Sequence, residues 1–156
     1  MKNLQAGPLS LQYSDGSLWN IRLGEEEAVR RIYLVFQDIN WTSRPFEILE
    51  ENWNIAEDHF SAELQVRGSK DAENFEASLK IVGTPAGEIK YAFSGSTSAD
   101  FMRNRLGLCL LHPIADLAGK PCKLSLSGGT KIISAFPKDI SPSQPFKNLS
   151  GISHTL

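Results

Sequence analysis

The chain has 156 residues, of which 41% are hydrophobic and 22% are charged, a composition typical of a globular domain and not of a disordered or fibrous protein. A domain near this length buries about 68–70% of its unfolded surface, so an apolar core can form without disulfides or metals. Sixteen basic and eighteen acidic residues give a formal net charge of −2. Because no long basic run occurs, we expect neither a nucleic acid nor an anionic membrane as a partner.

The first clear pattern is an alternation of apolar and polar residues over 9–14, which predicts a strand with one buried face. Asp15-Gly16 follows this strand, and both residues tolerate positive φ, so we expect a two-residue hairpin turn. The returning strand places three apolar side chains on one face, namely Trp19, Ile21 and Leu23.

Residues 25–36 fit two different structures. Ala28, Val29 and Ile32 recur at spacings that suit a helix. However, the run from Ile32 to Phe36 consists of β-branched, aromatic and aliphatic residues, which suit a central strand better. We favour the strand and keep the helix as the alternative.

The later segments repeat the period of two. Strict alternation over 60–67, over 75–81 and over 89–93 predicts three more strands, the last two joined through a loop at 83–87. Four further segments read as extended, although less regularly. These segments are 47–55, 101–111, 121–126 and 131–136.

Taken together, the segments predict an all-β fold of about nine to eleven short antiparallel strands. We favour two packed sheets, a β-sandwich, over the alternative of a β-barrel. Prolines and serines are frequent between 137 and 145, and proline cannot donate to a sheet ladder. We therefore expect the β domain to span residues 1–136 and an ordered loop or linker to span residues 137–156.

Histidines and cysteines give no complete catalytic or metal site. His112 follows an apolar run, and a histidine at a strand end can act as a general base or contact a substrate. We favour a simpler role, a hydrogen bond to the backbone where the strand stops. His59 and His154 show no convergence with His112, and Cys109 and Cys122 lack metal-type spacing, so we expect no metal and no cofactor.

Arg103-Asn104-Arg105 is a candidate binding element. On a regular strand positions 103 and 105 point to the same side, which would set two guanidinium groups next to each other. Such a pair could hold a carboxylate, a phosphate or sugar hydroxyls through bidentate hydrogen bonds. We favour a simpler role, in which each arginine pairs with a nearby carboxylate on the surface or at a domain interface.

The three tryptophans could offer flat apolar faces to a sugar ring. Trp19 and Trp53 are in phase with apolar neighbours, so we expect both in the core. Trp41 lies between Asn40 and Thr42 just past a strand, which makes it the best candidate for an exposed platform. Even for Trp41 we favour packing in the core or at an interface and keep the platform as the alternative.

The sequence also bears on the compartment. The first residues contain no continuous apolar stretch, and no run approaches the roughly 18 apolar residues of a membrane span. We therefore expect a cytoplasmic protein without a signal peptide or a membrane segment. In that compartment Cys109 and Cys122 are expected to be buried thiols and not a disulfide.

Four stretches form a series that covers nearly the whole chain, from Ala6 to His154. They are AGPLSLQYSDGSLWNIRLG from Ala6, VRRIYLVFQDINW from Val29, FMRNRLGLCLLHPI from Phe101 and FPKDISPSQPF from Phe136. The most specific part is Arg-Asn-Arg-x-Gly-x-Cys-x-Leu-His-Pro in the third stretch. In this order the stretches resemble the N-terminal part of the apionate lactonase family.

This resemblance implies that the chain is the front portion of a longer protein. Members of the family are several times longer, carry a glycosidase-type α/β barrel after the β domain, and open apionolactone to apionate. The resemblance places the reacting carboxylates beyond Leu156, and the abrupt final segment 151–156 is compatible with truncation. One departure puts the substrate class in doubt, because the family carries histidine where this chain has Ser143.

Our leading hypothesis is therefore an accessory N-terminal domain, not catalytic alone, of a larger sugar-lactone hydrolase. The domain would pack on the downstream catalytic region, and the segment 101–112 would approach the active site. Arg103, Arg105 and His112 would then contact the interface or substrate oxygens. The alternatives are a stand-alone carbohydrate-binding module that uses Trp41, and a purely structural domain without a ligand.

Overall fold

The computed structural model describes residues 1–69, 74–139 and 145–155. The chain forms two compact units, Met1–Leu111 and His112–Leu156, and each unit has its own cluster of buried apolar residues. All regular elements of the described residues are strands except one short helix, α1 (Ile114–Leu117). No helix in these ranges has the length and apolar character needed to cross a membrane.

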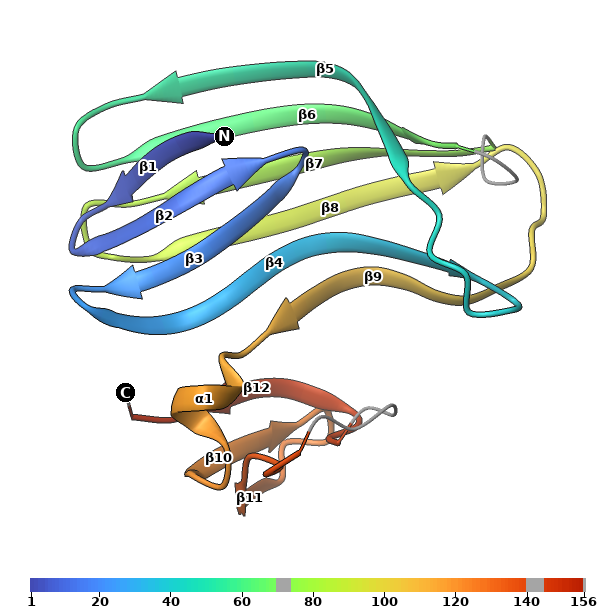
Figure 1. Cartoon of the computed structure of the whole chain (residues 1–156). Coiled ribbons are helices and arrows are strands. Elements are labelled where there is room, and N and C mark those ends of the chain that lie inside the picture. The colour runs from blue at the N-terminus through green and yellow to red at the C-terminus, as the bar shows by residue number, and fades with distance from the viewer. Residues whose placement is uncertain (70–73, 140–144, 156) are drawn as a thin grey trace. The chain divides into compact units, whose positions relative to one another are not determined.

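The first unit is built from nine strands among its described residues (Figure 1). In chain order they are β1 (Lys2–Ala6), β2 (Leu9–Ser14), β3 (Ser17–Leu23), β4 (Glu26–Asp38), β5 (Phe46–Ile55), β6 (Phe60–Gly68), β7 (Phe75–Gly83), β8 (Ile89–Thr97) and β9 (Arg103–Leu111). They form a five-stranded sheet in the order β1-β2-β3-β4-β9 and a four-stranded sheet in the order β5-β6-β7-β8, both antiparallel.

The two sheets enclose one apolar core, which confirms the predicted sandwich. Leu18 and Leu34 come from the five-stranded sheet, whereas Phe60, Leu64 and Ile81 come from the four-stranded one, and all five side chains are buried. Both sheets are open, with β1 and β9 at the edges of one and β5 and β8 at the edges of the other. Within the described ranges no closed barrel forms, so that alternative is wrong.

The regular alternation predicted for the second half of this unit is confirmed. Along β6 and β7 every second side chain is buried, and the two strands pair in an unbroken register from Phe60↔Gly83 to Arg67↔Glu76. A period of two is the spacing at which one face of a strand meets a core. Hydrophobic burial on that face therefore fixes the register of the sheet.

The contested segment 25–36 is a strand, as we favoured. Except for Glu25, which belongs to the preceding turn, it lies within β4, which pairs with β3 on one side and with β9 on the other. Leu34 and Phe36 are buried, with 8% and 2% of their surfaces exposed. A strand with neighbours on both sides favours β-branched and aromatic residues, which explains why this preference outweighed the helical spacing.

The hairpin at Asp15-Gly16 forms as predicted, with φ of 48° and 70°. The core position predicted for Trp19 is wrong, because Leu18 takes it instead. Asn20 has a left-handed φ of 49°, and the register between β2 and β3 shifts there, so that Leu18 and Ile21 are both buried although they are three residues apart. This irregularity breaks the alternation that placed Trp19 inward.

The second unit contains a three-stranded antiparallel sheet in the order β11-β10-β12. Its strands are β10 (Pro121–Leu126), β11 (Lys131–Ala135) and β12 (Leu149–Ser153). Leu117, Cys122, Leu124 and Phe136 form its small buried core. The predicted boundary at 136/137 falls inside this unit, and β12 comes from the segment predicted as a linker. With β12 the described residues hold twelve strands, one more than the upper end of our count.

A pair of leucines tests the assignment of the core. Leu64 has 1% of its surface exposed and Leu49 has 46%. Leu64→Ala should lower the free energy of unfolding by about 2–5 kcal/mol because it leaves a cavity between the sheets. Leu49→Ala should change it by less than about 0.5 kcal/mol. Urea unfolding measures both values, and equal effects would contradict the assignment.

Candidate functional site

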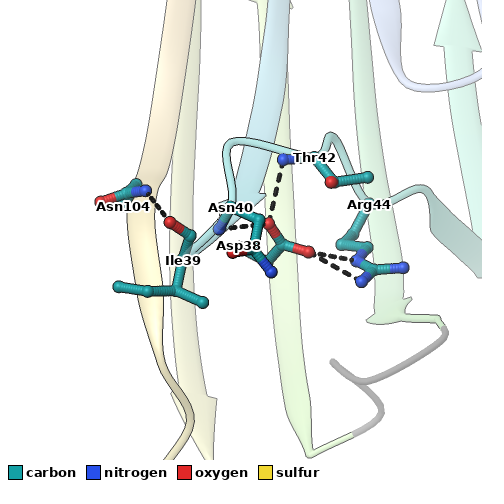
Figure 2. Close-up of polar contacts among 6 residues, drawn as sticks. All are labelled: Asp38, Ile39, Asn40, Thr42, Arg44 and Asn104. Carbon is teal, nitrogen blue, oxygen red and sulfur yellow. Dashed lines mark hydrogen bonds and ion pairs between the residues drawn. The ribbon is translucent and has the colours of Figure 1, made fainter.

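The connection between β4 and β5 is organised by one carboxylate, that of Asp38 (Figure 2). Its Oδ1 accepts hydrogen bonds from the backbone N–H groups of Asn40 and Thr42, each at 2.9 Å. Its Oδ2 accepts two more from the guanidinium of Arg44, at 3.0 Å from Nε and 2.7 Å from Nη2. Both oxygens are thus used within the turn, and the bidentate pair fixes the direction in which the chain leaves β4.

These contacts also set the charge state of Asp38. Partial burial by itself would raise the pKa of the carboxyl group. The N–H donors of Thr42 and Asn40 and the Arg44 guanidinium outweigh burial, so the pKa of Asp38 lies below its ordinary value. The carboxylate is therefore ionised at neutral pH, the state in which it can accept all four hydrogen bonds.

The same turn is tied to the edge strand β9. The side-chain amide of Asn104 donates a hydrogen bond of 2.6 Å to the carbonyl oxygen of Ile39, as Figure 2 shows. Asn104 is the extra residue of a β-bulge, because Asp38 pairs with Arg103 and Gln37 pairs with Arg105. The bulge leaves the Asn104 side chain in reach of the neighbouring turn.

Trp41 is the residue that this turn presents to solvent. Its side chain is 60% exposed, so Trp41 does not pack in the core, one of the two packing roles that we favoured for it. Its φ is 64°, a left-handed value that is unfavourable for a bulky residue and persists only when the surroundings hold it. The Arg105 guanidinium carbon lies 5.7 Å from the centre of the Trp41 ring, at the outer range of a cation–π contact.

The two predicted arginines are not set next to each other. The bulge at Asn104 pairs Arg103 with Asp38 and Arg105 with Gln37, which are consecutive residues of β4. Consecutive strand residues face opposite sides of a sheet, and cross-strand partners share a side. Arg103 and Arg105 therefore belong to opposite sides, and the bidentate arginine pair expected from a regular strand does not form.

His112 lies in the second unit and contacts His154, a residue that the sequence analysis did not place near it. Its ring centre is 5.4 Å from that of His154 and 5.0 Å from that of Phe136. Burial, and after it the neighbouring His154, lowers the pKa of His112 to about 4. At neutral pH His112 is thus an uncharged imidazole in an aromatic cluster, and the pairing of β10 with β12 is what brings His154 close.

A second arginine–aromatic group on the five-stranded sheet was missed in the sequence. The guanidinium carbon of Arg31 lies 3.9 Å from the centre of the Trp19 ring and 4.0 Å from that of Tyr33. Arg31 also donates a hydrogen bond of 3.0 Å to the Ser17 hydroxyl. Trp19 and Arg31 are cross-strand partners. Their contact could therefore be predicted only from the pairing of β3 with β4, which the sequence alone does not give.

Across residues 1–69, 74–139 and 145–155, no group of three or more His, Cys, Asp or Glu side chains is placed to hold a metal ion. The strongest polar constellation, around Asp38, is saturated by its own turn. Ser143, where we noted a departure from the family pattern, lies outside the described residues.

Comparisons with known proteins place the chain in context. The family model described as "D-apionate lactonase, N-terminal domain" matches residues 1–156. A D-apionate lactonase from Brucella anthropi is 31% identical over 153 residues, which is 97% of this chain and 25% of that protein. The chain thus spans about a quarter of the length of this curated relative. No solved structure matches the chain.

The Asp38 network can be tested by removing its charge. Asp38→Asn should free the turn, so that the Thr42 amide exchanges with solvent about tenfold faster, the scale of one lost charge-assisted hydrogen bond. Because the pKa of Asp38 is lowered, protection should persist above about pH 4 and fall as acid protonates the carboxylate. Hydrogen exchange by NMR measures both. Asp58→Asn, at an exposed carboxylate, is the control and should leave Thr42 unchanged.

The His112 cluster predicts a pH dependence in the second unit. The pKa of about 4 lies below the ordinary value of about 6.5, so the unfolded chain binds more protons between these values. Stability should therefore be complete above about pH 6.5 and decrease toward pH 4. Hydrogen exchange of residues 121–126 against pH measures this change. The slope should disappear in His112→Gln, and a slope that survives would refute this assignment.

Proposed function

Because the chain belongs to the family of D-apionate lactonase N-terminal domains, we propose that it is the accessory β-sandwich domain of a larger sugar-lactone hydrolase and is not catalytic alone. The observation that carries this proposal is the length of the chain relative to that of the lactonase from Brucella anthropi. The chain spans 25% of a relative that is named a lactonase, so three quarters of that protein have no counterpart here. The partner of this chain is then the catalytic region of the same polypeptide.

Lactone hydrolysis adds water to an ester carbonyl and releases a hydroxy acid. The reaction needs a group that activates the water and donors that stabilise the developing oxyanion. In this proposal both lie in the downstream region, and the substrate is the lactone of a branched-chain pentose. The name of the Brucella relative supports that substrate class.

Within this chain we assign Arg103, Arg105 and His112 to contacts with the downstream region or with substrate oxygens. Arg105 is the strongest of the three because it is half-buried on an edge strand, beside an exposed tryptophan. A guanidinium group in that position can donate two hydrogen bonds to a carboxylate, the group that lactone opening creates. The free thiols Cys109 and Cys122 fit a reducing compartment, and we assign the protein to the cytoplasm.

One observation favours a second candidate function, a carbohydrate-binding module. Trp41 is 60% exposed and offers a flat apolar face of the kind that packs against sugar C–H groups. In that case the chain would bind saccharides without the downstream region. A purely structural domain without any ligand is the remaining alternative.

The proposal is tested by comparing the full-length protein with residues 1–156 alone. Acid release from apionolactone, followed by pH-stat, should be catalysed by the full-length protein only. Circular dichroism should show that the isolated residues 1–156 are folded, so that their inactivity is meaningful. Comparable turnover by residues 1–156 alone would refute an accessory role, and inactivity of the full-length protein would refute the substrate class.

Arg105→Ala in the full-length protein tests the assigned contact. It should lower kcat/KM roughly tenfold or more, the effect of one lost hydrogen bond to a charged group. Arg67→Ala is the matched control, because Arg67 pairs with Glu76 on the other sheet of the sandwich. Equal activities of the two variants would remove Arg105 from the site.

A further inference from the structure

Three apolar side chains are strongly exposed around the Asp38 turn and the start of β9. Ile39 is 50% exposed, Trp41 60% and Met102 72%. Ile39 is joined to β9 through Asn104, and Met102 lies two residues before Asn104 in the chain. We call the group formed by Ile39, Trp41, Met102 and Arg105 the Trp41 surface. An exposed apolar group with an arginine at its border is a common mark of a binding surface.

The Trp41 surface is held rigid before any partner arrives. The Asp38 carboxylate accepts four hydrogen bonds from the turn, and the Asn104 amide adds a fifth at Ile39. These contacts hold Trp41 at a left-handed φ of 64°, a conformation it would leave if the turn were free. Because the backbone of the turn is already fixed in this way, a partner that binds it loses less conformational entropy on binding.

The chemistry around Trp41 favours a protein partner over a saccharide. Sugar recognition needs polar groups that reach the hydroxyls beside the stacked ring. Here the oxygens of Asp38 and the amide of Asn104 are already used inside the turn, and the polar side chains exposed next to Trp41 are the short ones of Asn40 and Thr42. Ile39 and Met102 add exposed apolar surface on the turn and just before β9. Tryptophan, methionine and arginine are the residue types enriched where proteins bind one another.

We propose that the Trp41 surface docks onto the downstream catalytic region of the same polypeptide. This inference rests on the proposed function, since it takes its partner from the lactonase-length protein, of which the chain spans a quarter. Covalent linkage gives that partner a high effective concentration, so a small surface with one large aromatic anchor is sufficient. Trp41 inserts into the partner, and Arg105 lies at the rim of the contact.

The test is photo-crosslinking within the full-length protein. Trp41→benzoylphenylalanine, irradiated and digested, should give crosslinked peptides from beyond residue 156. Leu49→benzoylphenylalanine is the matched control, because Leu49 is 46% exposed on the edge strand β5. Crosslinks from position 41 only to residues 1–156, or no excess over position 49, would overturn the proposal.

A second readout keeps the test independent of the photoreactive group. In the full-length protein, residues 38–44 should exchange more slowly than in residues 1–156 alone, and Ile39→Ala with Trp41→Ala should abolish that difference. Both residues are exposed, so the double variant should keep the circular dichroism of the parent. Saturable binding of apiose or xylose that Trp41→Ala removes, without crosslinks beyond residue 156, would assign the surface to saccharides and overturn docking.

The same preparations separate this inference from the proposed function. Apionolactone hydrolysis without crosslinks beyond residue 156 would overturn the docking surface and leave the lactonase assignment intact. Crosslinks without hydrolysis would support the docking surface and overturn the lactonase assignment.

Discussion

The carboxylate of Asp38 is the interaction on which the arrangement of the first unit depends. β4 is a central strand of one sheet and β5 is an edge strand of the other, so the chain must leave one layer and enter the next within the residues between Asp38 and Phe46. Asp38 satisfies the N–H groups of Asn40 and Thr42 and holds Arg44 at the exit of this crossing. An ionised side chain thus supplies the partners that a sheet ladder would otherwise give the backbone.

Most of the sandwich could be predicted from local chemistry. The alternation along β6 and β7 reflects burial of one face, and Asp15-Gly16 encodes a turn by its tolerance of positive φ. The preference of Ile32–Phe36 for a strand outweighed a helical spacing because β4 has neighbours on both sides. In each case the deciding information is contained within a few residues of the chain.

The features that were mispredicted or missed depend on pairing between distant strands. The bulges at Asn20 and Asn104 are register shifts against β2 and β4, and no local pattern shows them. They moved Trp19 out of the core and set Arg103 and Arg105 apart. His112 and His154 are likewise brought close by β10 and β12, whose pairing spans residues that were read as a linker. A domain boundary based on proline content therefore fell inside the second unit and did not identify it.

The two irregularities near Trp41 act as one device. In a regular strand without the bulge at Asn104, the Asn104 amide would not be directed toward the carbonyl of Ile39. Arg105 would then lie on the same side of the sheet as Arg103. Without the Asp38 network, Trp41 would relax from its left-handed conformation. A bulge and a strained residue each cost stability, and neither improves the core that Leu18 and Leu64 already fill. What the two together achieve is the fixed presentation of one tryptophan beside one arginine, and a benefit of that kind arises only when another molecular surface meets them.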